Sequence, residues 1–210
     1  MAELTFFYGT MNCGKSTLAL QLHHNHVASG KRVWLFTMHD REVGRISSRI
    51  GLSQAAVTVD PGFDFWAHVR ARIDHGEVVD ALICDEAQFY TPAQVEQLAR
   101  IVDELDVDVQ AFGLLADFAT HLFPGSRRLL ELADRRREMQ VEALCWCGAR
   151  GTQNARTVGG LIVRSGDQVV VGDVAGDETA YEVLCRRHHR DGVTRSVADR
   201  LPDVHEVVVR

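Results

Sequence analysis

The sequence has 210 residues, of which 46% are hydrophobic and 25% are charged, a composition typical of a globular protein with a hydrophobic core. Its formal net charge of −6 argues against sequence-independent binding to a nucleic-acid backbone. No apolar run approaches the roughly 18–20 residues of a membrane span, and the start of the chain has no signal-peptide pattern. We therefore expect a cytoplasmic protein that binds neither membranes nor nucleic acid.

The most informative stretch lies near the N-terminus. Residues 4–8 are apolar and aromatic, which is typical of a buried strand. Residues 9–16 fit G-x-x-x-x-G-K-[ST], the pattern of a phosphate-binding loop, and a helix is predicted from residue 17 to Ser29, with Gly30 as its left-handed stop. Lys15 is expected to reach the outer phosphates and Ser16 to ligate Mg²⁺. The candidate phosphate-binding residues are Gly9, Thr10, Met11, Asn12, Cys13, Gly14, Lys15 and Ser16.

Strand and helix patterns alternate along the following part of the chain. Residues 31–37 predict a second strand, and residues 65–75 have approximately helical spacing of apolar side chains. Between them, residues 38–53 are polar and aperiodic, too long for a simple connection, and such loops are often functional or disordered.

An acidic pair follows the next predicted strand. Residues 78–84 are mostly apolar and lead directly into Asp85 and Glu86. A protein with a phosphate-binding loop needs a carboxylate at the end of a strand opposite that loop to hold Mg²⁺. We expect Asp85 to be that carboxylate.

The clearest helix signal begins at Thr91. Thr91 as N-cap, Pro92 in the first helical position and Gln94 form a capping box, and the apolar spacing continues to Leu105. Residues 107–113 predict a fourth strand, residues 114–126 an irregular loop and residues 140–144 a fifth strand. The arginines in between favour a solvated helical face over a basic patch; they are Arg127, Arg128, Arg135, Arg136 and Arg137.

Strands that alternate with helices predict a mostly parallel sheet covered by helices on both faces. Ligands of such sheets lie at the carboxyl ends of the strands. Gly9, Asp85 and Leu114 all fall at such ends, so we expect the active site there.

A second, small region begins after residue 141. Short β-type runs cover residues 160–164, 168–171 and 181–184, which is too little to bury a sufficient core without a staple. Cys145 and Cys147 precede these runs, and Cys185 and His188 follow them, in the manner of a structural zinc ribbon. Because Cys-x-Cys is tighter than usual zinc spacing, buried thiols without a metal remain an alternative, and His189 could replace His188. Residues 190–210 predict a loose tail.

Together these residues resemble the thymidine kinase family of the cytosolic and bacterial type. The resemblance covers roughly residues 3–188. It rests on the Met-containing phosphate loop, the segment Ser47-Ser48-Arg49, Asp-Glu-x-Gln-Phe at residues 85–89, and Gly113-Leu114 followed by Asp117-Phe118. The cysteine pair, residues 168–172, Tyr181 and Cys185-Arg186-x-His188 complete it.

The resemblance implies that Glu86 is the general base for the nucleoside 5′-hydroxyl. It also implies that Asp85, Glu86, Ala87 and Gln88 belong to the ATP site, and that Arg41 lies near the phosphate or ribose. The implied nucleoside-binding residues are Met11, Phe89, Leu114, Phe118, Phe123, Val169, Val170, Val171, Gly172, Asp173 and Tyr181. For Phe118 and Phe123, core packing is an alternative. The sequence departs from the family at Asp173, where Gly is frequent, and in a longer stretch over residues 174–179.

The resulting prediction is an α/β fold: a RecA-like P-loop NTPase domain (residues 1–141), a zinc-ribbon domain that binds the nucleoside (142–189) and a tail (190–210). The predicted function is transfer of the ATP γ-phosphoryl group to the 5′-hydroxyl of thymidine, and also of deoxyuridine, with Mg²⁺ and structural Zn²⁺. The family implies a homotetramer inhibited by thymidine triphosphate. Two alternatives are a P-loop ATPase coupled to nucleic acid through the zinc ribbon, and a nucleotide-binding regulator without turnover, which Glu86 beside Asp85 disfavours.

Overall fold

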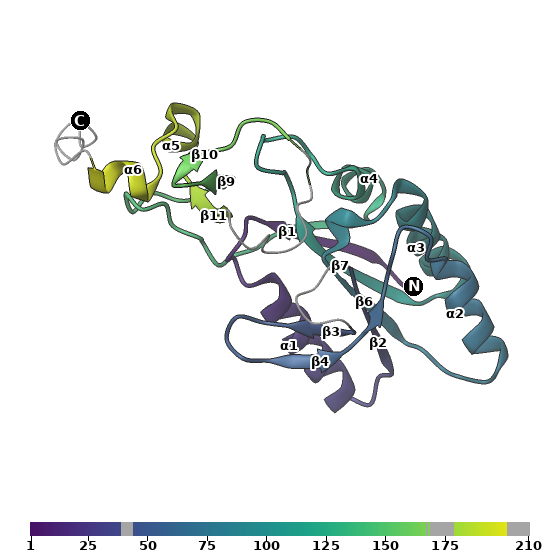
Figure 1. Cartoon of the computed structure of the whole chain (residues 1–210). Coiled ribbons are helices and arrows are strands. Elements are labelled where there is room, and N and C mark those ends of the chain that lie inside the picture. Colours follow the sequence, from purple (N-terminus) through teal and green to yellow (C-terminus); the bar gives the residue numbers. More distant parts are fainter. Residues whose placement is uncertain (39–43, 167, 169–178, 201–210) are drawn as a thin grey trace. The chain divides into compact units, whose positions relative to one another are not determined.

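The computed structural model describes residues 1–38, 44–166, 168 and 179–200 (Figure 1). The chain forms two compact units. The first contains residues 1–9, 14–115 and 122–140, and the second contains residues 10–13, 116–121 and 141–210. Loops 10–13 and 116–121 thus belong to the second unit, although the sequence analysis counts them with the first domain.

The first unit is built on a sheet in the strand order β5-β2-β6-β7-β1-β8. All neighbouring strands of this sheet are parallel, as the sequence predicts. The strands are β1 (Leu4–Gly9), β2 (Val33–Thr37), β5 (Val57–Thr58), β6 (Ala81–Asp85), β7 (Asp108–Leu114) and β8 (Arg135–Glu138). Two further strands, β3 (Arg45–Ser47) and β4 (Ser53–Ala55), pair as an antiparallel hairpin.

Helices cover both faces of this sheet (Figure 1). Because side chains of a strand alternate between the faces, β6 contributes Leu82 and Cys84 to one core and Ile83 to the other. The helices α2 (Phe65–Asp74), α3 (Pro92–Leu105) and α4 (Pro124–Leu132) cover the first face, and α1 (Lys15–Ala28) covers the second. A 3₁₀ turn, η1 (Ala87–Phe89), follows β6.

The predicted start of α3 and the predicted end of α1 have the expected local chemistry. Thr91 accepts a hydrogen bond from the Gln94 N–H, and the Gln94 side chain accepts one from the Thr91 N–H, so the capping box is present. The helix after the phosphate-binding loop ends at Ala28, and Gly30 has a φ of 88°, which only glycine adopts without strain.

Four predictions for this unit differ from the structure in detail. The last parallel strand is β8 rather than residues 140–144, so Arg135, Arg136 and Arg137 lie on an exposed edge strand and not on a helical face. Charged side chains suit an exposed edge strand. Because β8 has no apolar residues, a search for hydrophobic patterns does not detect it. The aperiodic segment 38–53 contains β3, and the irregular loop 114–126 already contains the start of α4.

The second unit contains a three-stranded antiparallel sheet in the order β10-β9-β11. The elements of this unit are β9 (Gln153–Val158), β10 (Leu161–Ile162), β11 (Thr179–Leu184), α5 (Arg186–Asp191) and α6 (Arg195–Arg200). Thr194 and Ala198 are buried, so the predicted loose tail is instead folded up to residue 200.

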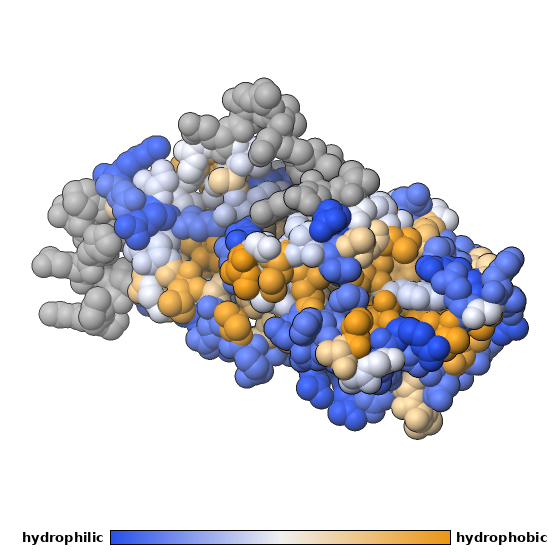
Figure 2. Space-filling view, turned by 90° about the horizontal axis from the view of Figure 1, so that it is seen from below, coloured by the Kyte–Doolittle hydropathy of each residue, from blue (hydrophilic) through white to orange (hydrophobic). Residues whose placement is uncertain are grey.

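Apolar side chains are also exposed on the surface. Figure 2 shows hydrophobic side chains interspersed with hydrophilic ones on one face of the molecule. Ile50, Leu144 and Leu161 are the most exposed large apolar side chains of the described residues after the terminal Met1. Over the ranges that the structure describes, none of the helices has the length and apolar character needed to cross a membrane.

Candidate active site and metal centre

The phosphate-binding motif connects β1 to α1. β1 ends at Gly9 and α1 begins at Lys15, whose side chain is buried. Asn12 and Gly14 both have positive φ, 63° and 80°, and this left-handed geometry turns the chain sharply into the helix. Helix N-termini that follow such turns present backbone N–H groups and a positive dipole end to phosphate. The motif thus has the structural context that its sequence requires.

Asp85 ends β6 and is 1% exposed. The hydroxyl of Ser16 donates a hydrogen bond to its carboxylate. Burial, with the charge of Glu86 as the second cause, raises the pKa of Asp85 to about 7, against the opposing effects of Ser16 and Lys15. Its Oδ1 is buried and accepts no hydrogen bond from the described residues. A buried carboxylate oxygen without a partner, beside a serine hydroxyl, fits a Mg²⁺ site, because Mg²⁺ prefers oxygen ligands.

Thr37 has a second buried oxygen without a hydrogen-bond partner among the described residues, next to Asp85. It ends β2 and lies opposite Asp85 in the parallel register. Its Oγ1 is buried and has no hydrogen-bond partner in the described ranges. Buried hydroxyl groups normally have partners, so Thr37 is a candidate contact for a metal-bound water that the sequence analysis did not identify.

Replacing Asp85 by Asn is expected to stabilise the protein in the absence of divalent cations. Because the folded-state pKa of Asp85 is raised, wild-type stability falls as the pH rises from about 4 to about 7 and stays lower above that. Asn carries no charge and avoids this loss, so at pH 8 in EDTA we expect a gain of a few kcal/mol at most. Urea unfolding at pH 5 and pH 8 measures the difference.

We expect Mg²⁺ to reverse the order of stability in this experiment. Mg²⁺ should stabilise the wild type and leave Asp85→Asn unchanged. Asp103→Asn, an exposed position on α3, is the matched control and should follow the wild type. An Asp85→Asn variant that is less stable than the wild type at pH 8 in EDTA would contradict the inferred cost of burying this charge.

Glu86 and Gln88 form a hydrogen-bonded pair in the turn after β6. Glu86 has φ 54° and ψ 32°, a left-handed conformation that is uncommon for a residue other than glycine and occurs often at functional sites. The Gln88 Nε2 donates to Glu86 Oε2 at 2.5 Å, and Gln88 Oε1 accepts from the backbone N–H of Leu114 at 3.0 Å. Gln88 is 1% exposed. A buried amide therefore holds the Glu86 carboxylate against the end of β7.

The close packing of α4 supports this turn. A Cβ atom on Gly125 would lie 2.5 Å from the carbonyl oxygen of Tyr90 and 2.7 Å from that of Ala87. Only glycine permits such an approach of the helix to η1. The Ser126 hydroxyl also donates to the Leu114 carbonyl oxygen at 2.5 Å. The first turn of α4 thus fixes both η1 and the end of β7.

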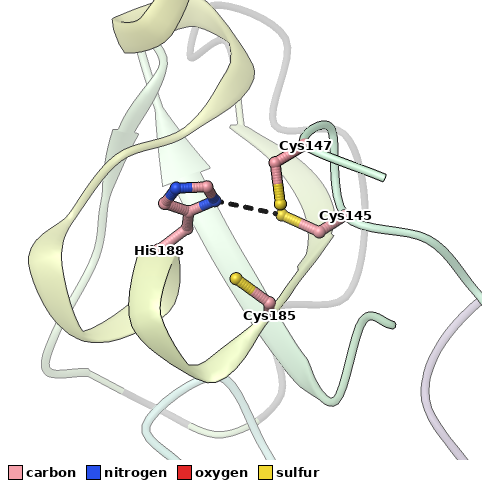
Figure 3. A group of neighbouring side chains, drawn as sticks. All are labelled: Cys145, Cys147, Cys185 and His188. Carbon is pink, nitrogen blue, oxygen red and sulfur yellow. Dashed lines mark hydrogen bonds between the residues drawn. The ribbon is translucent and has the colours of Figure 1, made fainter. Parts of the chain in front are cut away.

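A cluster of three cysteines and one histidine lies in the second unit (Figure 3). Cys145 and Cys147 come from a turn closed by the Gly148 N–H, which donates to the Cys145 carbonyl oxygen at 2.9 Å. Cys185 is the N-cap of α5 and His188 lies in its first turn. One potential ligand atom from each residue lies within 4.8 Å of the others. Three sulfurs and one imidazole at this spacing fit a structural metal ion of the Zn²⁺ type.

The histidines at residues 188 and 189 have different surroundings. His188 Nδ1 lies 3.4 Å from Cys145 Sγ, and the His188 ring stacks on Trp146 with centroids 4.2 Å apart. His189 Nε2 instead lies 2.9 Å from the carbonyl oxygen of Phe118. Since a carbonyl oxygen only accepts, this nitrogen of His189 donates. The geometry therefore favours His188 over His189 as the fourth ligand.

The other predicted nucleoside contacts are distributed over both units. In the first unit, Phe89 and Phe123 meet edge to face with centroids 5.6 Å apart, and Phe123 is buried. In the second unit, Phe118 is buried under the Arg156 guanidinium at 3.8 Å, whereas Tyr181 is 43% exposed. Arg41, Val169, Val170, Val171, Gly172 and Asp173 lie outside the described residues.

Comparison with known proteins decides the family. The family model described as thymidine kinase matches residues 2–189. The chain belongs to the thymidine kinase family. Among its relatives, thymidine kinases from Streptomyces coelicolor and Cutibacterium acnes are 60% and 56% identical to it, each over 94% of this chain and 93% of the relative. The family resemblance in the sequence is thereby confirmed.

Two solved structures have a weaker likeness to the chain. They are domain III of the replication initiation protein DnaA from Thermotoga maritima and the Pif1 helicase from Candida albicans. They cover 65% and 66% of this chain, 54% and 36% of their own chains, and have TM-scores of 0.38 and 0.41 at 15% identity. Scores this low bear on neither the fold nor the function of this member of the thymidine kinase family.

Proposed function

We propose that the protein transfers the γ-phosphoryl group of ATP to the 5′-hydroxyl of thymidine. The observation that carries the proposal is the pair Asp85 and Glu86 at the carboxyl end of β6, in a chain that also has a phosphate-binding motif. A nucleotide-binding protein needs the first carboxylate for its metal, whereas the second suits proton transfer. The name thymidine kinase, borne by relatives 56–60% identical to the chain, supports thymidine as the acceptor.

The phosphate groups of ATP are assigned to residues 9–16. Lys15 would neutralise charge on the outer phosphates, and backbone N–H groups at the start of α1 would bind their oxygens. Ser16 and Asp85 would hold Mg²⁺, which neutralises negative charge as the phosphoryl group moves. Ala87 and Gln88 complete the proposed ATP site, with Gln88 acting through its hydrogen bonds to Glu86 and Leu114.

Glu86 is the proposed general base. Phosphoryl transfer depends mainly on positioning and charge neutralisation, so a carboxylate that orients the hydroxyl and accepts its proton late is sufficient. The hydrogen bond from Gln88 limits the rotamers that the Glu86 side chain can adopt. Glu86 would therefore meet the incoming 5′-hydroxyl in one orientation.

The nucleoside site remains a proposal based on family resemblance. We assign it to Met11, Phe89, Leu114, Phe118, Phe123, Tyr181 and residues 169–173. The Arg156 guanidinium lies over the Phe118 ring, and Phe118 is buried, so little of this ring is free to contact a base. Deoxyuridine is included as a substrate because it lacks only the methyl group of thymidine. An apolar pocket discriminates only weakly against a substrate that lacks one methyl group.

A Zn²⁺ ion bound by Cys145, Cys147, Cys185 and His188 is proposed as the staple of the second unit. The hydrophobic cluster of the second unit contains Cys145, Ala155 and Leu184, with Cys147 and Cys185 packed against it. The metal ligands thus form a large part of the small core. Because these thiols must stay reduced to bind metal, we place the protein in the cytoplasm.

The remaining parts of the proposal concern regulation and assembly. By family resemblance we propose a homotetramer and feedback inhibition by thymidine triphosphate. Sedimentation of the purified protein and product formation with increasing thymidine triphosphate test these two points separately.

The function is tested with purified protein, ATP and Mg²⁺ against parallel acceptors. Thymidine and deoxyuridine should give 5′-monophosphates, whereas deoxycytidine should give little product. Single-stranded DNA should not stimulate ATP hydrolysis. ATP hydrolysis that depends on DNA, without any nucleoside monophosphate, would replace the proposed function by that of a nucleic-acid-coupled ATPase.

A further inference from the structure

Asn154 lies on β9, the central strand of the sheet in the second unit. Successive side chains of a strand point to opposite faces. Ala155 joins the hydrophobic cluster that contains the cysteine ligands, so Asn154 and Arg156 point to the other face. Asn154 is 7% exposed. A buried amide at such a position must use its hydrogen-bonding groups within the protein.

The Asn154 carboxamide binds two loops that are distant in the sequence. Its Oδ1 accepts a hydrogen bond from the Met11 backbone N–H at 2.9 Å, and its Nδ2 donates to the Ala116 carbonyl oxygen at 3.0 Å. The N–H can only donate and the carbonyl can only accept, so the orientation of the amide is fixed by its partners. Both loops belong to the same compact unit as β9.

Loop 116–121 keeps its own shape through other contacts. Asp117 Oδ1 accepts hydrogen bonds from the N–H groups of Ala119 and His121, both at 2.9 Å. The loop is also anchored by His189 at the Phe118 carbonyl oxygen and by Gln168 at Asp117 Oδ2. Removal of the Asn154 amide is therefore expected to shift the start of this loop rather than to unfold it.

We propose that Asn154 is a positioning residue for substrate binding. Its single amide holds the backbone of Met11, in the phosphate-binding motif, and the backbone of Ala116. This inference rests on the proposed function, in which Met11 and Phe118 contact the nucleoside. Lys15 and Ser16 belong to α1, and the contact of the amide with the phosphate-binding motif is at Met11, before the helix begins. The effect of Asn154 should therefore fall on thymidine more than on ATP.

The variant Asn154→Ala tests the proposal, with Gln153→Ala on the same strand as the matched control. We expect Asn154→Ala to raise KM for thymidine by about tenfold, because it leaves the buried Met11 N–H and Ala116 carbonyl unpaired and lets both loops shift to regain partners. KM for ATP and the zinc content should change by less than about twofold. Gln153→Ala should match the wild type. An unchanged KM for thymidine, or an equal rise of both KM values with zinc loss, would overturn the proposal.

Hydrogen exchange separates the two bonds without relying on activity. Asn154→Ala should accelerate exchange in residues 10–13 and 116–121 and leave residues 145–150 unchanged. Asn154→Asp keeps an acceptor for Met11 but places an oxygen against the Ala116 carbonyl, so only residues 116–121 should exchange faster. Uniform acceleration over the whole unit, or none in either loop, contradicts the positioning role. If the wild type fails to phosphorylate thymidine, the proposed function fails while this exchange test still decides the role of Asn154.

Discussion

Replacing Glu86 by Gln is expected to lower kcat for thymidine phosphorylation by about 10²–10⁴-fold, the usual contribution of a general base. The substitution keeps the size of the side chain and its contact with Gln88, but removes the group that accepts the proton. Binding of ATP and thymidine should persist. Steady-state kinetics and calorimetric titration with each substrate measure the two quantities separately.

Asp85 gives this experiment an internal check. The charge of Glu86 is the second cause, after burial, that raises the pKa of Asp85. Glu86→Gln removes that charge, so the pKa of Asp85 should fall. Glu104→Gln, the same change at an exposed position on α3, should leave kcat unaltered. An unaltered kcat in Glu86→Gln would remove this residue from the proposed mechanism.

The second large effect is expected from Cys145→Ser. Cys145 is 2% exposed and belongs both to the metal cluster and to the small hydrophobic core. Coordination of structural zinc contributes roughly 10–16 kcal/mol in isolated zinc fingers, far more than a cluster built around Ala155 and Leu184 can supply. We therefore expect zinc loss and unfolding of β9, β10 and β11, measured by metal analysis and hydrogen exchange.

A second buried thiol serves as the control for this variant. Cys84 is fully buried in β6, outside the metal cluster. Cys84→Ser also buries a hydroxyl group, and should weaken the first unit while the zinc content stays at that of the wild type. Full zinc occupancy in Cys145→Ser would show that the ligand set is wrong.

The sequence predicted those parts of the fold that have a local chemical signature. Thr91 and Gln94 predict a helix start because the side chain of each forms a hydrogen bond with the backbone of the other. Residues 9–16 predict the turn into α1. Asp85 was predictable because an apolar strand ends in an acidic residue. The four residues of the metal cluster were predicted from their types and from their grouping in two pairs around short β-type runs, although Cys-x-Cys is tighter than the usual zinc spacing.

The parts that could not be predicted depend on contacts between distant residues. β8 is an edge strand of arginines, and its pairing with β1 leaves no hydrophobic pattern to detect. Thr37 gains its place beside Asp85 only through the parallel register of β2 and β6. Asn154 and His189 act on Met11 and Phe118, which are 143 and 71 residues away in the chain, and neither carries a motif that would indicate such a partner.

The most direct test of phosphoryl transfer is ³¹P NMR of a mixture of the protein, ATP, Mg²⁺ and thymidine. Transfer to the 5′-hydroxyl predicts that thymidine 5′-monophosphate and ADP appear in equal amounts, without accumulation of inorganic phosphate. Accumulation of ADP and inorganic phosphate, with thymidine unchanged, would contradict it.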